Sequence, residues 1–294
     1  MTSIKLRELG DDVFLASGSP ATLIVIEGEI AYVVDPGCPS KRGKLLRKAL
    51  AKRGVSKVIA LLTHGHGDHV SAVPSLKPDL VLAPLLEIGQ VIEPAFREGV
   101  ALEYPFHRET DLMMFELIRV PEAEPLEDHE LNCLSPIELP GHTFGHVGFL
   151  KDKFAYVGDA VFGDKLLGRV GVPFYLDHRL ALETIARLRD LVRGGFTLIL
   201  SHGPVVKGGE ALKLLDKNEK RLREVGRAIL RVLRKGGLSD RELAFRVLGE
   251  LGAETSPLSV LLASKTVKSF LAKYYEEGVV RVELRGGEIV WALL

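Results

Sequence analysis

The stretch Leu61-Leu62-Thr63-His64-Gly65-His66-Gly67-Asp68-His69 is the most informative part of the chain. The apolar run that leads into it is typical of a buried strand. His64 and His66 are two positions apart, so both imidazoles can face the same way in an extended segment. Asp68 and His69 begin an expected helix, so their side chains diverge from the first pair. Imidazole and carboxylate groups suit zinc and iron, and this one loop can therefore offer ligands to two neighbouring metal ions.

The whole chain excludes several classes of protein. Its 294 residues, 46% hydrophobic and 27% charged, suffice for one large domain with a small appendage. The net formal charge of zero gives no global sign of a nucleic-acid or membrane-surface binder. The two cysteines, Cys38 and Cys133, are too far apart to indicate a disulfide framework or a thiolate zinc site. With no signal-peptide pattern at residues 1–5 and no apolar run near the ~20 residues of a membrane span, we expect a cytoplasmic protein.

Side-chain amides are scarce in this chain. Gln90 is the only glutamine, and Asn132 and Asn218 are the only asparagines. Thermolabile amides are depleted in proteins of hot organisms, so we predict a thermophilic source and a melting midpoint above roughly 65 °C.

The first part of the chain alternates strands with helices, which is typical of a sheet covered by helices. Asp35 ends the third expected strand, where a buried carboxylate needs a cationic or hydrogen-bonding partner. The expected elements are strands 13–15, 22–27 and 30–35, a helix 40–52, a strand 57–62, a helix 68–76 and a strand 80–83.

The segment 85–135 is harder to interpret. Residues 85–97 have the pattern of a helix, and an apolar cluster at 112–118 lies beside acidic residues. We interpret the segment as an elaboration over the active site or as a subunit contact, and the second alternative predicts a homodimer.

The second half places further candidate ligands beside strands. The expected order is a strand 137–139, a hairpin of strands 147–150 and 154–157, a glycine-rich loop 162–175, a helix 179–192 and a strand 197–200. His142 follows the first of these strands, Asp159 the hairpin and His202 the last strand. Because strand ends in a packed sheet converge on one rim, we expect these residues to meet the first loop.

The tail from about residue 207 changes character. We expect three helices followed by a hairpin. The helices run over 212–233, from Ser239 onward and over 257–275, and the hairpin consists of strands 279–284 and 289–293. Ser239 with Glu242 has the spacing of a capping box. Three helices and a hairpin are the element order of a winged-helix unit, so we predict a catalytic domain 1–206 and a winged-helix-like domain 207–294. The tail carries 17 Lys and Arg against 12 Asp and Glu, a balance of +5.

The candidate ligands divide into two sets. One metal ion would be held by His64, His66 and His142, and the other by Asp68, His69 and His202, with Asp159 as the bridge. Two metals roughly 3.5–4 Å apart can share a water and lower its pKa, which would give a metal-bound hydroxide as nucleophile. Asp35 is expected to accept a hydrogen bond that orients a ligand such as a histidine ring.

These motifs carry a family resemblance. The stretch Thr63–His69 resembles the HxHxDH motif of the metallo-β-lactamase superfamily, and the other motifs follow in the right order at Asp35, Pro140-Gly141-His142-Thr143, Gly158-Asp159 and Ser201-His202-Gly203. Over residues 12–206 the resemblance implies an α/β fold, the four-layer αββα sandwich, and the glyoxalase II-like branch, whose members have this full ligand set. The body with its tail is similar to the β-lactamase-like-protein-2 group, which includes endoribonucleases.

Four residues beyond the ligands are candidates for substrate contact. Tyr175 and His178 flank the expected site loop, with packing or capping as the alternative. Lys165 and Arg169 could meet an anionic substrate, with a solvated loop as the alternative. His146, four residues after His142, is interpreted as structural.

The leading hypothesis is a dinuclear metal hydrolase acting on a small ester or thioester, with Asp68 and His69 as catalytic residues. The two divalent ions are expected to be zinc, with iron or manganese as alternatives. A second hypothesis is an endoribonuclease on single-stranded RNA, motivated by the basic tail. A third is a mononuclear iron dioxygenase of persulfide type that uses His64, His142 and Asp159. A non-enzymatic binding module is the remaining alternative.

Overall fold

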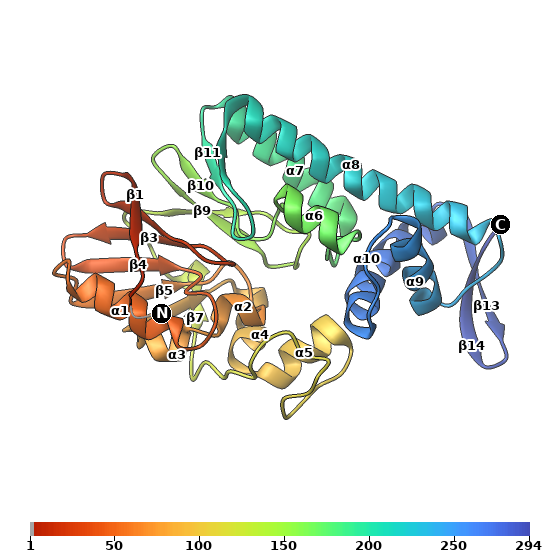
Figure 1. The fold of residues 1–294 in the computed structure, drawn as a ribbon, viewed down its shortest axis with the longest axis horizontal. Coiled ribbons are helices and arrows are strands. Elements are labelled where there is room, and N and C mark those ends of the chain that lie inside the picture. The colour runs from red at the N-terminus through yellow and green to blue at the C-terminus, as the bar shows by residue number, and fades with distance from the viewer. Residues whose placement is uncertain (1–2) are drawn as a thin grey trace. The chain divides into compact units, whose positions relative to one another are not determined.

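The computed structural model describes residues 3–294 (Figure 1). The chain divides into two compact units. Unit 1 comprises the chain up to Leu139, Gly145–Asp159 and Phe196–Val206, and unit 2 comprises Pro140–Phe144, Ala160–Gly195 and Lys207–Leu294. Unit 1 therefore holds most of the predicted ligands, whereas the segment with His142 belongs to unit 2.

A seven-stranded sheet, with its strands in chain order, forms the centre of unit 1. The first four strands pair antiparallel and the last four parallel, so the sheet switches pattern at β4. Parallel neighbours need crossover connections, and helices lie in all three: α1 between β4 and β5, α2 and α3 between β5 and β6, and a further group of short helices between β6 and β7. The elements are β1 (Leu6–Gly10), β2 (Val13–Ala16), β3 (Thr22–Glu27), β4 (Ile30–Val34), α1 (Arg42–Ala51), β5 (Lys57–Leu61), α2 (Gly67–Val70), α3 (Val73–Leu76), β6 (Leu80–Ala83) and β7 (Glu124–Pro125).

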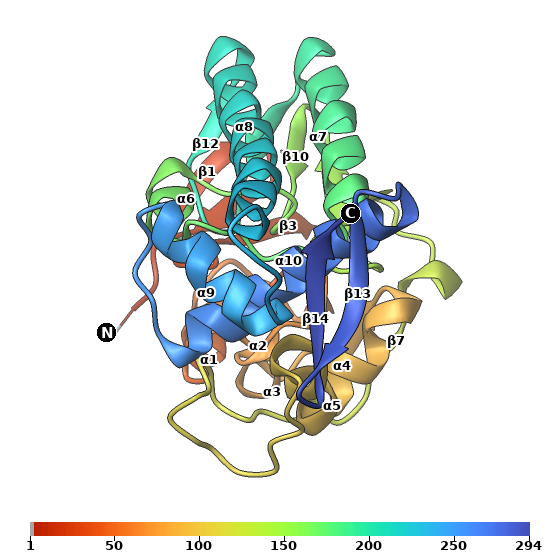
Figure 2. The same cartoon turned by 90° about the vertical axis from the view of Figure 1, so that its right-hand side faces the viewer.

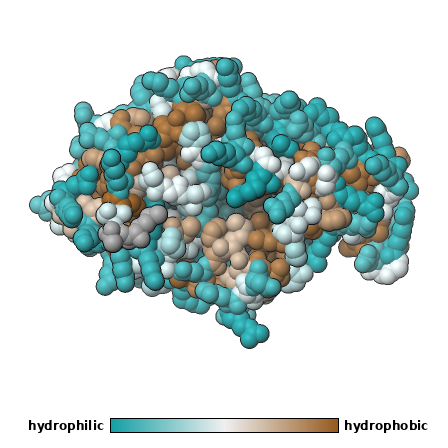
Figure 3. All heavy atoms as spheres, viewed as in Figure 1, coloured by the Kyte–Doolittle hydropathy of each residue, from teal (hydrophilic) through white to brown (hydrophobic). Residues whose placement is uncertain are grey.

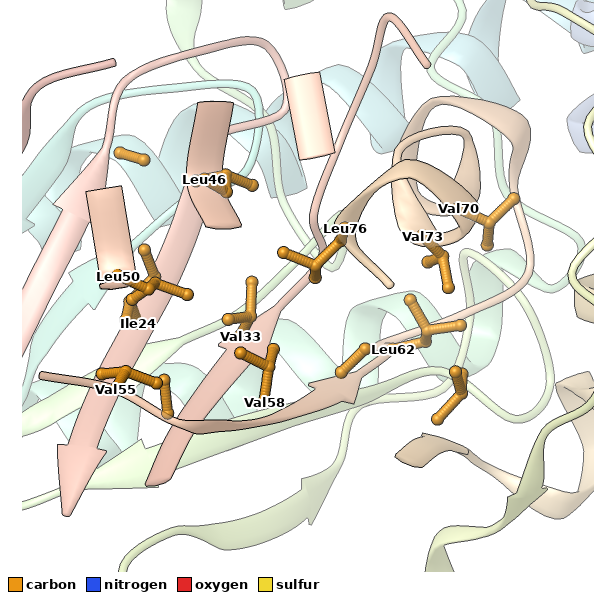
Figure 4. Packing of buried hydrophobic residues seen from close by; sticks show 14 of the residues in the cluster. Ile24, Val33, Leu46, Leu50, Val55, Val58, Leu62, Val70, Val73 and Leu76 are labelled. Atoms are coloured by element: carbon orange, nitrogen blue, oxygen red, sulfur yellow. The ribbon is translucent and has the colours of Figure 1, made fainter. Parts of the chain in front are cut away.

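Both faces of this sheet are buried, so unit 1 contains three layers. On one face, Leu46 and Leu50 of α1 and Leu76 of α3 pack on strand residues such as Val33 and Val58 (Figure 4). The other face packs on a five-stranded sheet of order β12-β11-β10-β9-β8 through a second apolar cluster. That sheet consists of β8 (Ser135–Glu138), β9 (Val147–Lys151), β10 (Phe154–Tyr156), β11 (Thr197–Ile199) and β12 (Val205–Lys207).

Two predicted helices of unit 1 are each divided, so both predictions are wrong in detail. The helix expected over 68–76 is split into α2 and α3, with Pro74 in the first turn of α3. The helix expected over 85–97 is split into η1 (Leu85–Glu87), α4 (Ile88–Ile92) and α5 (Pro94–Leu102). Pro94 lacks the N–H that a continuous helix needs, and Glu93 instead caps α5.

Unit 2 is mostly helical. It contains α6 (Asp164–Val170), α7 (His178–Arg193), α8 (Gly208–Leu233), α9 (Asp240–Glu250), α10 (Pro257–Glu276) and the hairpin of β13 (Val280–Arg285) with β14 (Glu288–Leu293), visible in Figure 2. The helix α6 lies where a glycine-rich loop was expected. The tail has the predicted order of three helices and a hairpin, while the winged-helix assignment and the boundary at 207 stay predictions.

Helix capping in the tail differs from the prediction. Ser239 caps α9 by accepting the backbone N–H of Glu242. The reciprocal capping box is formed at α10, between Ser256 and Ser259. Short polar side chains at the N-cap satisfy backbone donors that the helix itself leaves open.

Several large apolar side chains are exposed in the segment of unit 1 that follows β6. Leu85, Leu86, Phe96 and Met114 are all more than half exposed. Figure 3 shows one face of the protein, on which apolar areas lie between hydrophilic side chains. The apolar cluster predicted at 112–118 runs without helix or strand. A homodimer contact there stays a prediction. Among the described residues, no helix has both the length and the apolar character required to cross a bilayer.

Candidate metal centre

Four predicted site positions of unit 1 directly follow strands. Asp35 follows β4, the loop Thr63–His69 follows β5, Asp159 lies beyond β10 and His202 beyond β11. The strands β4 and β5 are parallel neighbours, so their carboxyl ends meet at one edge of the sheet. His64, Asp68, His69 and Asp159 are all buried.

Asp35 is fully buried and accepts four hydrogen bonds. Its carboxylate accepts from the Thr63 backbone N–H at 2.9 Å, the Thr63 hydroxyl at 2.8 Å, His69 Nδ1 at 2.8 Å and the Tyr156 hydroxyl at 3.1 Å. Because a carboxylate only accepts, His69 must carry its proton on Nδ1. Its Nε2 is then available to a metal, which is the orienting role predicted for Asp35.

The Nε2 atom of His69 lies in a cluster with two carboxylates and a second imidazole. It is 3.8 Å from Asp68 Oδ2 and 3.3 Å from Asp159 Oδ1. His202 Nε2 is 2.9 Å from Asp68 Oδ2 and 3.6 Å from Asp159 Oδ1. Two ligands on one tetrahedral zinc ion, with bonds of about 2.0–2.1 Å, lie roughly 3.3 Å apart. The donor atoms of Asp68, His69 and His202 thus have the spacing of ligands to one ion.

A second group of donors shares His69 with the first. The ligand atoms of His64, His69 and Asp159 all lie within 4.8 Å of one another, and the rings of His64 and His66 are 4.5 Å apart. The Thr63 hydroxyl donates its proton to Asp35, so at 2.9 Å it accepts from His64 Nδ1. With the proton on Nδ1, His64 Nε2 is the unprotonated nitrogen, which is the form that a metal ligand needs. Asp159 lies close to both groups, which suits the bridging role predicted for it.

The charges in this cluster favour a bound cation. Burial lowers the pKa of His66 to about 4, so its ring is neutral, as a metal ligand must be. The pKa of His69 is raised well above its usual range although burial opposes this, because Asp35, Asp68 and Asp159 surround the ring. The donor set is therefore rich in negative charge and imidazole nitrogen, and it fits divalent metal ions.

His142 is held within unit 2. Its Nδ1 lies 2.9 Å from the carbonyl oxygen of Phe174, which places the proton on Nδ1. Its ring also contacts those of Phe162 and Tyr175. Its role as a metal ligand stays a prediction. His146 is buried and accepts the Asp159 backbone N–H at Nε2, which supports its structural interpretation.

The four candidate substrate residues also lie in unit 2. Tyr175 is buried and donates its hydroxyl to the Ala160 carbonyl. His178 is buried, with its ring stacked 3.7 Å from that of Phe270. These contacts favour the packing alternative for both residues. Lys165 and Arg169 are exposed on α6, and their contact with substrate stays a prediction.

Sequence reasoning missed several residues that support the ligands. Ser19 lies 2.7 Å from His202 Nδ1 and orients that ring, and Tyr156 completes the partners of Asp35. Glu87 is buried against the first ligand loop. The one available signal for Glu87 was a carboxylate within an apolar stretch, Ala83-Pro84-Leu85-Leu86-Glu87-Ile88.

Known proteins resemble this chain in sequence and in fold. The model of the metallo-beta-lactamase superfamily matches residues 16–203. Hydroxyacylglutathione hydrolase 1 of Vibrio vulnificus is 30% identical over 171 residues, which are 57% of this chain and 57% of that protein. The atrochrysone carboxyl ACP thioesterase of Claviceps purpurea is 25% identical over 276 residues, or 92% of this chain and 79% of that protein.

Among solved structures, a beta-lactamase domain protein from Burkholderia ambifaria has a TM-score of 0.72 at 16% identity, with 99% of this chain and 94% of that chain covered. This likeness confirms the predicted α/β fold class. The family match covers well over half of the chain, and the motifs that it includes are those that first indicated the resemblance. The chain belongs to the metallo-β-lactamase superfamily.

Proposed function

We propose that this protein is a metal-dependent hydrolase that cleaves a thioester with an activated water. The observation that carries the proposal is the cluster of Asp68, His69, Asp159 and His202, whose donor atoms have the spacing of ligands around divalent ions. A bound divalent metal lowers the pKa of a coordinated water towards 7 and polarises a carbonyl oxygen. Such a site suits attack of water on an acyl carbon.

The chain's own residues orient the reacting groups. Asp35 and Thr63 hold the rings of His69 and His64 with Nε2 turned to the cluster, and Ser19 holds His202. We assign to the Asp68 carboxylate the role of orienting the attacking water and accepting its proton. The water oxygen bonds to the acyl carbon, the carbon–sulfur bond breaks, and the thiolate that leaves takes up a proton.

The choice of a thioester comes from the matched relatives. A hydroxyacylglutathione hydrolase and an ACP thioesterase both bear names that describe release of an acyl group from a thiol carrier. The chain spans 57% of the first of these proteins, so the inference concerns the reaction class. The acyl group and the carrier are left open.

We further propose two metal ions, most simply zinc. His64 and His66, with His142 as the third ligand, would hold one ion, and Asp68, His69 and His202 the other. Asp159 would bridge them. Only Thr143 and Phe144 separate His142 from Gly145 of unit 1, and this short connection supports its inclusion.

The test is metal quantitation paired with a substrate screen. The protein is purified without added metal, titrated with zinc, and assayed on panels of acyl thioesters and oxygen esters. We expect close to two metal ions per chain and turnover of thioesters. Asp68→Ala should lose one ion and reduce kcat/KM to below about 1% of wild type, because loss of a ligand costs more than the 10–100-fold typical of a supporting residue.

His129→Ala is the matched control. His129 is a half-buried histidine whose Nε2 pairs with Glu124, and it belongs to none of the candidate ligand groups. This variant should keep wild-type metal content and turnover. Absence of metal binding, or absence of turnover across both panels by the metal-loaded protein, would overturn the proposal. One iron per chain with oxygen consumption would favour the dioxygenase alternative.

A further inference from the structure

Glu87 is a buried carboxylate outside the ligand set. It ends η1, and 1% of its surface is exposed. Its Oε2 accepts the backbone N–H of Gly65 at 3.1 Å, and its Oε1 accepts the backbone N–H of Gly145 at 3.0 Å. The Gln90 side chain donates to Oε2 at 3.1 Å. Both oxygens are therefore used as acceptors, which is the capacity of an ionised carboxylate.

The two glycines belong to separate histidine-bearing loops. Gly65 lies between His64 and His66, and Gly145 directly precedes His146. One side chain thus ties together two backbone segments that are 80 positions apart in the sequence, since Glu87 is 22 positions from Gly65 and 58 from Gly145. Movement of either loop would break a hydrogen bond inside a buried site.

The approach of Glu87 and its neighbours requires glycine at both positions. A Cβ on Gly65 would lie 2.5 Å from Gln90 Cβ, and a Cβ on Gly145 would lie 2.8 Å from Leu86 Cβ. These distances are shorter than side chains tolerate, so the stretch from Leu86 to Gln90 fits against both loops only because they lack side chains there.

Gln90 and Arg97 hold Glu87 in position through buried hydrogen bonds. Gln90, the only glutamine of the chain, is buried beside Glu87. The side-chain nitrogen of Gln90 must face the Glu87 carboxylate, because the side-chain oxygen of Gln90 would be repelled by it. The buried guanidinium of Arg97 donates to the backbone carbonyl of Gln90 at 3.1 Å and to the backbone carbonyl of Ile118 at 2.7 Å. The carboxylate therefore acts from an anchored support.

We propose that Glu87 is a positioning residue that holds the loops of His64–His66 and Gly145–His146 in register, so that metal can be bound with the correct geometry. The proposal rests on the proposed metal-dependent function, because the register of the two loops affects metal binding only if His64, His66 and Asp159 are ligands. Glu87 has no direct part in the reaction. It acts through the backbone N–H of Gly65, between two proposed ligands, and through that of Gly145, beside His146, whose Nε2 accepts the backbone N–H of the proposed ligand Asp159.

The test compares Glu87→Gln with Glu127→Gln. Gln at position 87 keeps the size of the side chain but turns one acceptor into a donor that faces a backbone N–H. Glu127 is the matched control, since it lies in the same part of unit 1 and also accepts a backbone N–H with both oxygens, that of Leu85 at 3.2 and 3.0 Å. These hydrogen bonds of Glu127 involve neither Gly65 nor Gly145.

The readouts separate positioning from folding. Zinc affinity is measured by competition with a chromophoric chelator, coordination geometry by the visible spectrum of the cobalt-substituted protein, and folding by thermal unfolding of the metal-free protein. We expect Glu87→Gln to weaken zinc binding by about 10–100-fold, to change the cobalt spectrum, and to lower kcat more than it raises KM. Metal-free stability should change far less, and Glu127→Gln should match wild type throughout.

Glu87→Asp gives a graded check, because aspartate keeps both acceptors on a side chain one methylene shorter. It should fall between wild type and Glu87→Gln in zinc affinity. Wild-type affinity and an unchanged spectrum in Glu87→Gln would overturn the proposal, and so would failure of both variants to fold without metal, which would make Glu87 a folding residue. A wild-type protein that binds no metal would instead refute the proposed function.

Discussion

The ligand loop Thr63–His69 and the segment Leu85–Leu102 behind it contribute to the site in opposite ways. The loop offers side chains, and its glycines remove bulk. The segment offers Glu87 and Arg97, which act on backbone groups of other residues. Reactive chemistry and the structure that holds it in place therefore lie in different parts of the sequence.

The two regions also differ in regularity. The loop continues a parallel strand and ends in one short helix, whereas the segment is divided at Glu93 and Pro94 and continues without helix or strand to β7. A rigid strand end fixes the loop from one side. The segment packs Val91, Ile88 and Ile92 on the apolar core. It adds the buried polar contacts of Glu87 and Arg97, which are costly to break singly.

The largest effect on stability is expected for Asp35→Ala, which removes the carboxylate that holds the ligand loop through Thr63 and His69. The change leaves the Thr63 N–H, the Thr63 hydroxyl and His69 Nδ1 buried without this acceptor, while the Tyr156 hydroxyl keeps the Ala21 carbonyl at 2.7 Å. At about 1–3 kcal/mol for each buried orphan, the free energy of unfolding should fall by roughly 3–5 kcal/mol. Urea unfolding followed by circular dichroism measures it.

Tyr156→Phe is the graded control for Asp35→Ala, because it removes one donor and leaves the carboxylate in place. It should cost about 1 kcal/mol. If Asp35→Ala were as stable as Tyr156→Phe, the network around Asp35 would not support the loop.

The loop could be predicted from sequence because its function resides in side chains at short spacing. His64, His66, Asp68 and His69 have a recognisable order, and Asp35 stands at the end of an apolar run. Most strands were placed within a residue or two for the same reason, since alternation and apolar runs are local properties. The match to the metallo-β-lactamase superfamily confirmed the resemblance drawn from these motifs.

The segment could not be predicted because its partners are distant backbone groups. The contact of Glu87 with Gly145 spans 58 positions and leaves no local pattern. The apolar spacing of residues 85–97 favoured one helix, and the backbone limits at Pro94 overrode that propensity. The grouping of Pro140–Phe144 with the helical unit is likewise a matter of tertiary contact.

The next largest effect should follow removal of the anchor of the segment, in Arg97→Met. The side chain is buried and holds the carbonyls of Gln90 and Ile118, with Glu98 at 3.8 Å. The change should lower the free energy of unfolding by about 2–4 kcal/mol and speed proteolytic cleavage within 103–118. Cleavage at the wild-type rate would show that the segment does not depend on this anchor.

A smaller effect should distinguish two glycines, one in each region. In Gly65→Ala the new Cβ meets Gln90 Cβ at 2.5 Å, so the loop or the segment must shift, at a cost of about 1–3 kcal/mol. In Gly99→Ala, inside α5, the new Cβ lies 3.8 Å from Pro105, which is an ordinary van der Waals contact. That variant should gain about 0.5–1 kcal/mol from helix propensity. Equal thermal midpoints for the two variants would contradict the close fit of the segment on the loop.

The smallest effect concerns how the carboxylates of the two regions titrate. In the loop, the pKa of Asp68 is lowered although burial opposes this, because His69 and His202 face it. In the segment, burial raises the pKa of Glu98, with Arg97 acting in the opposite direction. Between the unfolded and folded pKa of Glu98, the folded state binds more protons, so the stability that Glu98 contributes is lost as pH rises through its folded pKa.

Glu98→Gln removes this titration. We expect the variant to gain stability relative to wild type as the pH is raised from 4 to 7, and the difference to level off above the folded pKa of Glu98. Urea unfolding of both proteins at several pH values measures the difference. A stability difference that is constant with pH would mean that burial does not shift the pKa of Glu98. A variant that instead loses stability relative to wild type as the pH rises would mean that charge lowers the pKa of Glu98, as it does for Asp68, and the contrast between the two regions would not extend to their acids.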